Sequence, residues 1–171
     1  PEPPPAESTL PGKSMRFNMT DYCLEAVALY KDLTGVKHLK DAPTPFVPEG
    51  SLVAADDEIV GTVAPVACKM LMKDLWLARL SRPEISKAIG DLATHIHKWS
   101  RNDDKKLHRL MGYIQFTSHY SLRGFIRDHP SKLKLLLFVD ADFAGDVETT
   151  RSTSGGLLVL AGPNSWFPIA W

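Results

Sequence analysis

The spacing of apolar and polar residues divides the chain into a helical first part and a second part made of short strands. In the first part apolar residues recur every three or four positions, which is the spacing of one face of an α-helix. This pattern predicts helices over 20–33, 64–80, 84–99 and 102–114. Shorter apolar runs bounded by turn residues predict strands at 122–126, 133–139, 154–160 and 166–171. This order predicts an α+β protein, in which a helical region precedes a partial mixed sheet, with a change of domain near residue 120 or 130.

Local signals add detail to the helical part. Ser81 and Glu84 have the spacing of a capping box, and Pro83 falls in the first turn, where its missing N–H costs little. Residues 36–61 are interrupted by prolines and acidic residues and are predicted to be a loop or linker. Residues 1–14 are Pro-rich and polar, which is typical of a disordered or extended lead-in.

The run 133–139 is almost continuously apolar, which predicts a central strand buried on both faces. It ends at Asp140, and two further carboxylates follow at Asp142 and Asp146. Clustered carboxylates at a strand end suit a hard divalent cation, so we predict Asp140 and Asp142 as metal ligands. A two-metal site needs more acids than these. The alternative is a polar turn, in which Asp140 accepts hydrogen bonds from backbone N–H groups.

Charge is distributed unevenly although the formal net charge is +0. Residues 79–134 contain 12 Lys and Arg against 5 Asp and Glu, whereas the segments on either side are acidic. A basic band beside an acidic strand end is typical of a path for a phosphate backbone that leads to a metal site. We predict Lys105, Lys106 and Arg109 as the nucleic-acid contacts. The alternative is that these charges form solvated surfaces without a partner.

The two cysteines, Cys23 and Cys68, lie far apart in apolar helical contexts, which predicts buried free thiols in a reducing compartment. No run of 18 apolar residues occurs, so no membrane partner is expected. We therefore expect an intracellular protein, cytoplasmic or nuclear. The chain begins at Pro1 and stops at Trp171 inside a predicted strand, which leads us to expect a part of a longer protein.

Four sequence blocks in a fixed order resemble copia-type retrotransposon Pol polyproteins. Residues 77–85 are similar to that family's LxxxTRPDI segment. Residues 138–146, 151–155 and 163–166 resemble its DADWAGD, RKSTSG and xISW motifs. The resemblance implies that 15–62 are a helix and linker from the end of the reverse transcriptase, and that 63–120 are a thumb-like or connection-like helical region. It further implies that 121–171 are the first strands of a truncated ribonuclease H-type sheet.

This resemblance implies a function for the intact parent, namely RNA-templated DNA synthesis and cleavage of the RNA in a hybrid with Mg²⁺. The family's first metal-binding carboxylate falls on Asp140, which the resemblance therefore implies as a catalytic residue, and Asp142 belongs to the same motif. The implied partners are an RNA–DNA hybrid or other nucleic acid and the remainder of the Pol polyprotein. The polymerase Tyr-x-Asp-Asp motif is absent and the later ribonuclease H acids would lie beyond Trp171, so the isolated chain is expected to be inactive. The alternative is a non-catalytic remnant that binds nucleic acid or protein.

Overall fold

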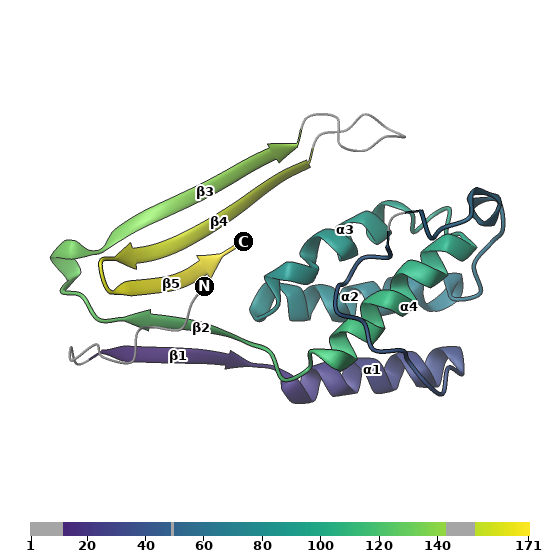
Figure 1. Ribbon diagram of the computed structural model, residues 1–171, viewed down its shortest axis with the longest axis horizontal. Helices are drawn as coiled ribbons and strands as arrows, with labels where there is room; N and C mark the ends of the chain where they lie inside the picture. The colour runs from purple at the N-terminus through teal and green to yellow at the C-terminus, as the bar shows by residue number, and fades with distance from the viewer. Residues whose placement is uncertain (1–11, 49, 143–152) are drawn as a thin grey trace. The chain divides into compact units, whose positions relative to one another are not determined.

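The computed structural model describes residues 12–48, 50–142 and 153–171. These residues form two compact units (Figure 1). The helical unit is Asn18–Ser121, and the sheet unit combines the described parts of Pro1–Phe17 and Leu122–Trp171.

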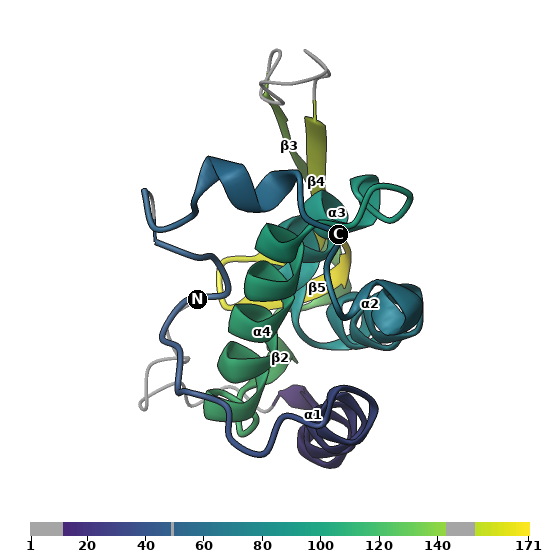
Figure 2. The same ribbon diagram turned by 90° about the vertical axis from the view of Figure 1, so that its right-hand side faces the viewer.

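The helical unit follows the predicted pattern closely. Its elements are α1 (Thr20–Thr34), η1 (Ala54–Asp57), α2 (Ala64–Leu80), η2 (Pro83–Ile85), α3 (Ser86–Thr94) and α4 (Arg101–Phe116). Helix α1 ends at Gly35, whose φ of 73° is the left-handed conformation that glycine adopts easily. Figure 2 shows α4 between α1 and α3, and it contacts both. The largest fully buried apolar side chains of this unit are Tyr30, Met70, Leu71, Leu77, Ile85, Ile89, Leu92, Leu107, Leu110, Met111 and Ile114.

The capping box predicted at Ser81 does not form, although Pro83 does begin a helical turn. The backbone N–H groups of Ser81 and Arg82 both donate to the carbonyl of Leu77 and so close the end of α2. Glu84 contacts Arg82 instead of the backbone of Ser81, so no capping box forms there. A short 3-10 turn follows, and α3 ends at Thr94, so the predicted continuous helix is shorter than its apolar spacing indicated.

The sheet unit contains five strands in the order β1-β2-β5-β4-β3. The strands are β1 (Lys13–Asn18), β2 (Ser121–Ile126), β3 (Lys134–Asp142), β4 (Thr153–Gly162) and β5 (Ser165–Ala170). The pairs β2 with β5, β5 with β4 and β4 with β3 are antiparallel, and Figure 1 draws β1 and β2 in opposite directions. The expected mixed sheet is therefore corrected to an antiparallel one. Parallel neighbours need a long crossover, whereas the two residues between β4 and β5 allow only a hairpin.

The prediction that β3 is a central, doubly buried strand is also wrong. Among the described strands β3 pairs only with β4, so it lies at the edge of the sheet. Its apolar side chains are exposed, with 62% of Leu135 and 74% of Val139 accessible to solvent. An apolar run records only the character of the residues, and it does not show whether another element covers them.

The structure also bears on the predictions for the two cysteines and for the N-terminal segment. Cys23 is buried in the core as predicted, whereas Cys68 is exposed, because the sequence context did not show which side of α2 faces the core. Of the predicted lead-in over 1–14, residues 1–11 lie outside the described part, and β1 has already begun at Lys13.

Candidate metal and nucleic-acid residues

Asp140 lies near the C-terminal end of β3, where it pairs with Gly155 of β4. Its side chain is exposed. A Cβ atom built on Gly155 would meet nothing within 4 Å, so no described residue crowds the sheet surface beside Asp140. In the described part of the chain, the strand end thus presents one carboxylate to solvent.

The other carboxylates of the predicted cluster lie largely outside the described part of the chain. Asp142 is described through its backbone pairing with Thr153, but its side chain is not, and Asp146 falls within 143–152. In the residues that the structure describes, no group of three His, Cys, Asp or Glu side chains is placed to hold a metal ion. Because Mg²⁺ binds through several oxygen ligands, Asp140 alone does not fit a complete Mg²⁺ site, and no chemical step through the metal follows from it.

The three predicted nucleic-acid contacts lie on α4 and are partly exposed. The Nζ atom of Lys105 is 2.5 Å from an Asp56 carboxylate oxygen. The Arg109 guanidinium donates to the carbonyl and the hydroxyl of Thr44, each at 3.0 Å. These contacts hold the loop between α1 and α2 along α4 (Figure 2). Lys105 and Arg109 therefore have a structural role, and a phosphate ligand would have to share them with the loop.

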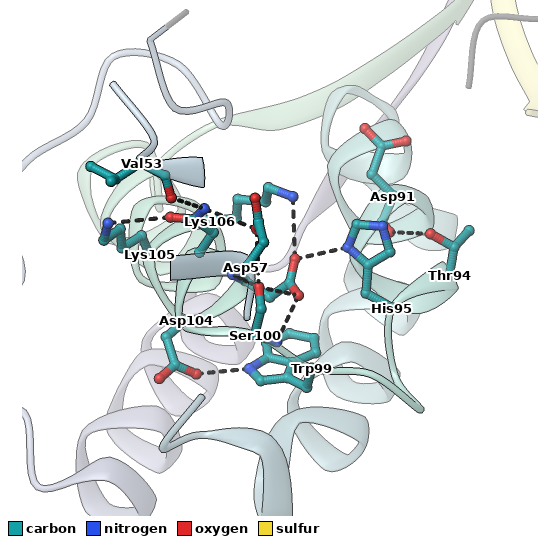
Figure 3. Close-up of polar contacts among 12 residues, drawn as sticks. Val53, Asp57, Asp91, Thr94, His95, Trp99, Ser100, Asp104, Lys105 and Lys106 are labelled. Carbon is teal, nitrogen blue, oxygen red and sulfur yellow. Dashed lines mark hydrogen bonds and ion pairs between the residues drawn. The ribbon is translucent and has the colours of Figure 1, made fainter. Parts of the chain in front are cut away.

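Lys106 belongs to a hydrogen-bond network around a buried carboxylate, which Figure 3 shows. Asp103 accepts from the backbone N–H and the hydroxyl of Ser100, both at 2.9 Å. His95 Nδ1 lies 2.9 Å and Lys106 Nζ 3.2 Å from the other oxygen. Burial alone raises the pKa of Asp103, but its hydrogen bonds with His95 and Ser100 and the Lys106 charge outweigh this and lower the pKa.

Ser100 and Asp103 form the capping box of α4, because the Ser100 hydroxyl accepts in turn from the Asp103 backbone N–H. This pair was not predicted, although the spacing of Ser100 and Asp103 is a recognisable signal. The next residue, Asp104, accepts from Trp99 Nε1 at 2.7 Å and from the backbone N–H of Thr62 at 2.6 Å (Figure 3 shows the contact with Trp99). The first turn of α4 is thus hydrogen-bonded to Thr62, just before α2, and to Trp99 and Ser100, just before α4.

Arg82, within the block 77–85, is a structural residue. Its side chain is 1% exposed and lies beside Glu84, with its Nε 2.5 Å from the carboxylate. The guanidinium also donates to the Thr117 carbonyl at 3.1 Å and to the Thr117 hydroxyl. It lies over the ring of Tyr113, 5.5 Å from the centroid. Arg82 therefore links the end of α2 to the end of α4. Its presence in the block 77–85 has this structural explanation, which needs no ligand.

Comparison with known proteins finds relatives at low identity. No known family model and no solved structure matches the chain. It is 38% identical over 88 residues to secreted RxLR effector protein 161 of Plasmopara viticola, covering 52% of the chain and 60% of that protein. It is 36% identical over 91 residues to the uncharacterized mitochondrial protein AtMg00810 of Arabidopsis thaliana, covering 53% of the chain and 37% of that protein. It is 24% identical over 157 residues to the retrovirus-related Pol polyprotein from transposon RE1 of Arabidopsis thaliana, covering 92% of the chain and 10% of that polyprotein.

The chain is therefore an α+β protein related to a retrotransposon Pol polyprotein. It spans less than two thirds of the length of each of these three relatives. None of its described helices is both long enough and apolar enough to span a lipid bilayer.

Proposed function

We propose that the chain is a segment of a copia-type Pol polyprotein, intracellular and either cytoplasmic or nuclear, that binds an RNA–DNA hybrid. In this proposal 15–62 come from the end of the reverse transcriptase and 63–120 from the helices behind it. Residues 121–171 supply the first strands of a ribonuclease H-type sheet. The parent would copy RNA into DNA and cleave the RNA of the hybrid.

The similarity to the RE1 polyprotein carries this proposal, because it extends over 92% of the chain and so includes residues of both units. The motif blocks at 77–85, 138–146, 151–155 and 163–166 support it, since they occur in the family's order. The identity of 24% is low, so the proposal depends on this extent and order together.

Each predicted site residue has a role in the proposal. Asp140 and Asp142 would be ligands of Mg²⁺, which when bound stabilises the charge that develops on a reacting phosphate. The remaining ligands would come from elsewhere in the polyprotein. Lys105, Lys106 and Arg109 would contact phosphates of the hybrid and position it without reading its sequence.

The binding part is tested by measuring the affinity of the whole chain for an RNA–DNA hybrid by fluorescence anisotropy at several salt concentrations. Replacing Lys105, Lys106 and Arg109 with Ala together should weaken binding and reduce the salt slope by about one for each phosphate that is no longer neutralised. The control replaces three exposed lysines of the same unit, Lys37, Lys40 and Lys69, which removes the same charge. Equal weakening in both triple variants would mean that binding depends on overall charge, and an unchanged slope in the first would remove α4 from the proposal.

A second candidate function is a non-catalytic remnant that binds nucleic acid or protein. It is favoured by the structural contacts of Lys105, Arg109 and Arg82, which bind partners inside the helical unit. The two functions differ in cleavage: a remnant binds the hybrid and leaves its RNA intact, even when the rest of a copia-type polyprotein is supplied.

A further inference from the structure

Three cationic residues are aligned along one face of α4. Arg101, Lys105 and Arg109 follow one another at intervals of four residues, so they lie on the same face of the helix, about 6 Å apart along its axis. All three are at least partly exposed. We call these three residues the cationic row. It extends the predicted phosphate contacts Lys105 and Arg109 by one turn, through Arg101, towards the start of α4.

An acidic turn, residues 53–58, lies against this row. The Asp56 carboxylate contacts two of the three cations at once, with one oxygen 2.5 Å from Lys105 Nζ and the other 3.4 Å from a guanidinium nitrogen of Arg101. The hydrogen bond from Lys105, together with the charges of Lys105 and Arg101, lowers the pKa of Asp56, which is therefore charged at neutral pH. A charged carboxylate that bridges two cations occupies the position that a phosphate group would take.

The acidic turn is held by polar contacts and not by burial. No residue of η1 is buried, and Val53 just before it is 56% exposed. Asn102 Nδ2 donates to the Val53 carbonyl at 2.8 Å and to Asp57 at 2.9 Å, and Figure 3 shows Val53 and Asp57 beside the start of α4. Exposed ion pairs contribute little to stability. A competing anion can therefore replace the turn without disturbing the core of the helical unit.

The segment that follows the turn is attached differently. The Arg101 backbone N–H donates to the Ile59 carbonyl at 2.8 Å, and the Gly61 N–H donates to the Trp99 carbonyl at 3.1 Å. These backbone contacts belong to the helix entry itself and use no side-chain charge. The turn can thus leave the cationic row while residues 59–61 stay in place.

We infer that the cationic row is one phosphate-binding site, and that the acidic turn masks it until a nucleic-acid backbone displaces Asp56. The inference rests on the proposed function, which supplies the nucleic acid. Because Asp56 is tethered beside the row, its effective concentration there is on the order of millimolar, so a single phosphate at lower concentration does not compete with it. A backbone presents several phosphates to the row together and does compete.

Affinity measurements on the whole chain test the masking. Asp56→Asn keeps the shape of the side chain and removes the competing charge, so it should bind an RNA–DNA hybrid about threefold more tightly than the wild type at low salt. The gain should shrink as salt rises, because salt screens an exposed ion pair. Glu58→Gln is the matched control, since it removes the same charge at an exposed position of the same turn, and it should leave the affinity nearly unchanged.

A second substitution tests the part that Arg101 plays in the row. In the Asp56→Asn background, where the row is unmasked, Arg101→Ala should weaken binding about threefold and lower the salt slope by about one. Lys69→Ala in the same background removes an equal charge from an exposed position of α2 and is the control. Equal effects of the two substitutions would exclude Arg101 from the site.

NMR signals of the backbone amides of 54–57 measure the displacement itself. The reference for a released turn is the double variant Arg101→Ala with Lys105→Ala, in which Asp56 has lost both of its cations. Adding the hybrid to the wild type should move the signals towards their positions in this variant. Inorganic phosphate at about 0.1 mM should leave them in place. Signals that stay fixed while the hybrid binds would contradict displacement.

The affinities also separate this inference from the proposed function. Equal affinity of the wild type and Asp56→Asn would overturn the masking and leave hybrid binding intact. Equal gains in Asp56→Asn and Glu58→Gln would overturn it too, because overall charge would then control the affinity. If neither the wild type nor Asp56→Asn binds at low salt, the inference and the binding part of the proposed function both fail. Binding by Asp56→Asn alone would support both.

Discussion

At the scale of single residues, Asp74 is the group whose environment departs most from its ordinary one. This α2 residue is fully buried, and neither of its carboxylate oxygens has a hydrogen-bond partner among the described residues. Burial without a partner favours the neutral acid, and it raises the pKa of Asp74 to about 8. The folded protein therefore holds a proton on Asp74 near neutral pH, where an unfolded chain does not.

This pKa makes stability depend on pH in a definite direction. Because the folded state binds the proton more tightly, the contribution of Asp74 is fully present below its ordinary pKa of 3.8 and is lost as pH rises towards about 8. Asp74→Asn cannot titrate, so its free energy of unfolding should fall less than that of the wild type between about pH 5 and pH 8. Urea unfolding at both pH values measures this, with Asp91→Asn at an exposed site as the control. If the free energy of unfolding depends on pH equally in the wild type and in Asp74→Asn, the proton is bound by another group.

Arg82 gives a second prediction at this scale. Removing a buried cation leaves Glu84 and the Thr117 carbonyl without their partner, so Arg82→Met should lower the free energy of unfolding by about 3 kcal/mol. Arg79→Met, at an exposed position of the same helix end, should change it by less than about 0.5 kcal/mol. Chemical unfolding followed by circular dichroism compares the two variants. Similar destabilisation in both would show that the interactions of Arg82 add little.

At the scale of elements, the capping box of α4 gives a prediction about helix stability. Ser100→Ala removes the hydroxyl that accepts from the Asp103 backbone N–H, and it should destabilise the helical unit by about 1 kcal/mol. Ser100→Thr keeps a hydroxyl and should restore most of this stability. Thermal unfolding of the three proteins tests the expectation. If Ser100→Thr is as unstable as Ser100→Ala, the effect comes from packing at this buried position and not from the cap.

Elements with a strong local signal were predictable from the sequence, and those that depend on distant partners were not. Helix α2 has the bounds that the apolar spacing predicted, and β2 to β5 lie where the apolar runs indicated. Strand β1 was missed because its short polar sequence becomes a strand only beside β2, which is more than a hundred residues later. The contacts of Lys105 and Arg109 were missed for the same reason, since Asp56 and Thr44 lie 49 and 65 residues away in the sequence.

For the whole molecule, the basic band over 79–134 belongs partly to the helical unit and partly to the sheet unit. Its lysines and arginines do not form one free surface, because Lys105, Lys106 and Arg82 have carboxylate partners within the helical unit. The sequence predicted the position of Asp140 at a strand end but not the exposure of the strand. The chain alone therefore has fewer lysine and arginine side chains free to bind a phosphate backbone than the sequence indicates.

Catalysis by the whole chain depends on how many metal ligands the strand end supplies. Hard-cation affinity grows with the number and charge of the oxygen ligands, and the described part of the strand end offers Asp140 only. We therefore expect that the purified chain does not cleave the RNA of an RNA–DNA hybrid in Mg²⁺, and that Asp140→Asn behaves in the same way. A labelled hybrid incubated with each protein, with and without EDTA, measures this on a denaturing gel. Mg²⁺-dependent cleavage by the wild type that disappears in Asp140→Asn would show that the chain carries a complete site, with ligands from 142–152. Cleavage that persists in Asp140→Asn would instead point to a contaminating nuclease or to a site away from β3.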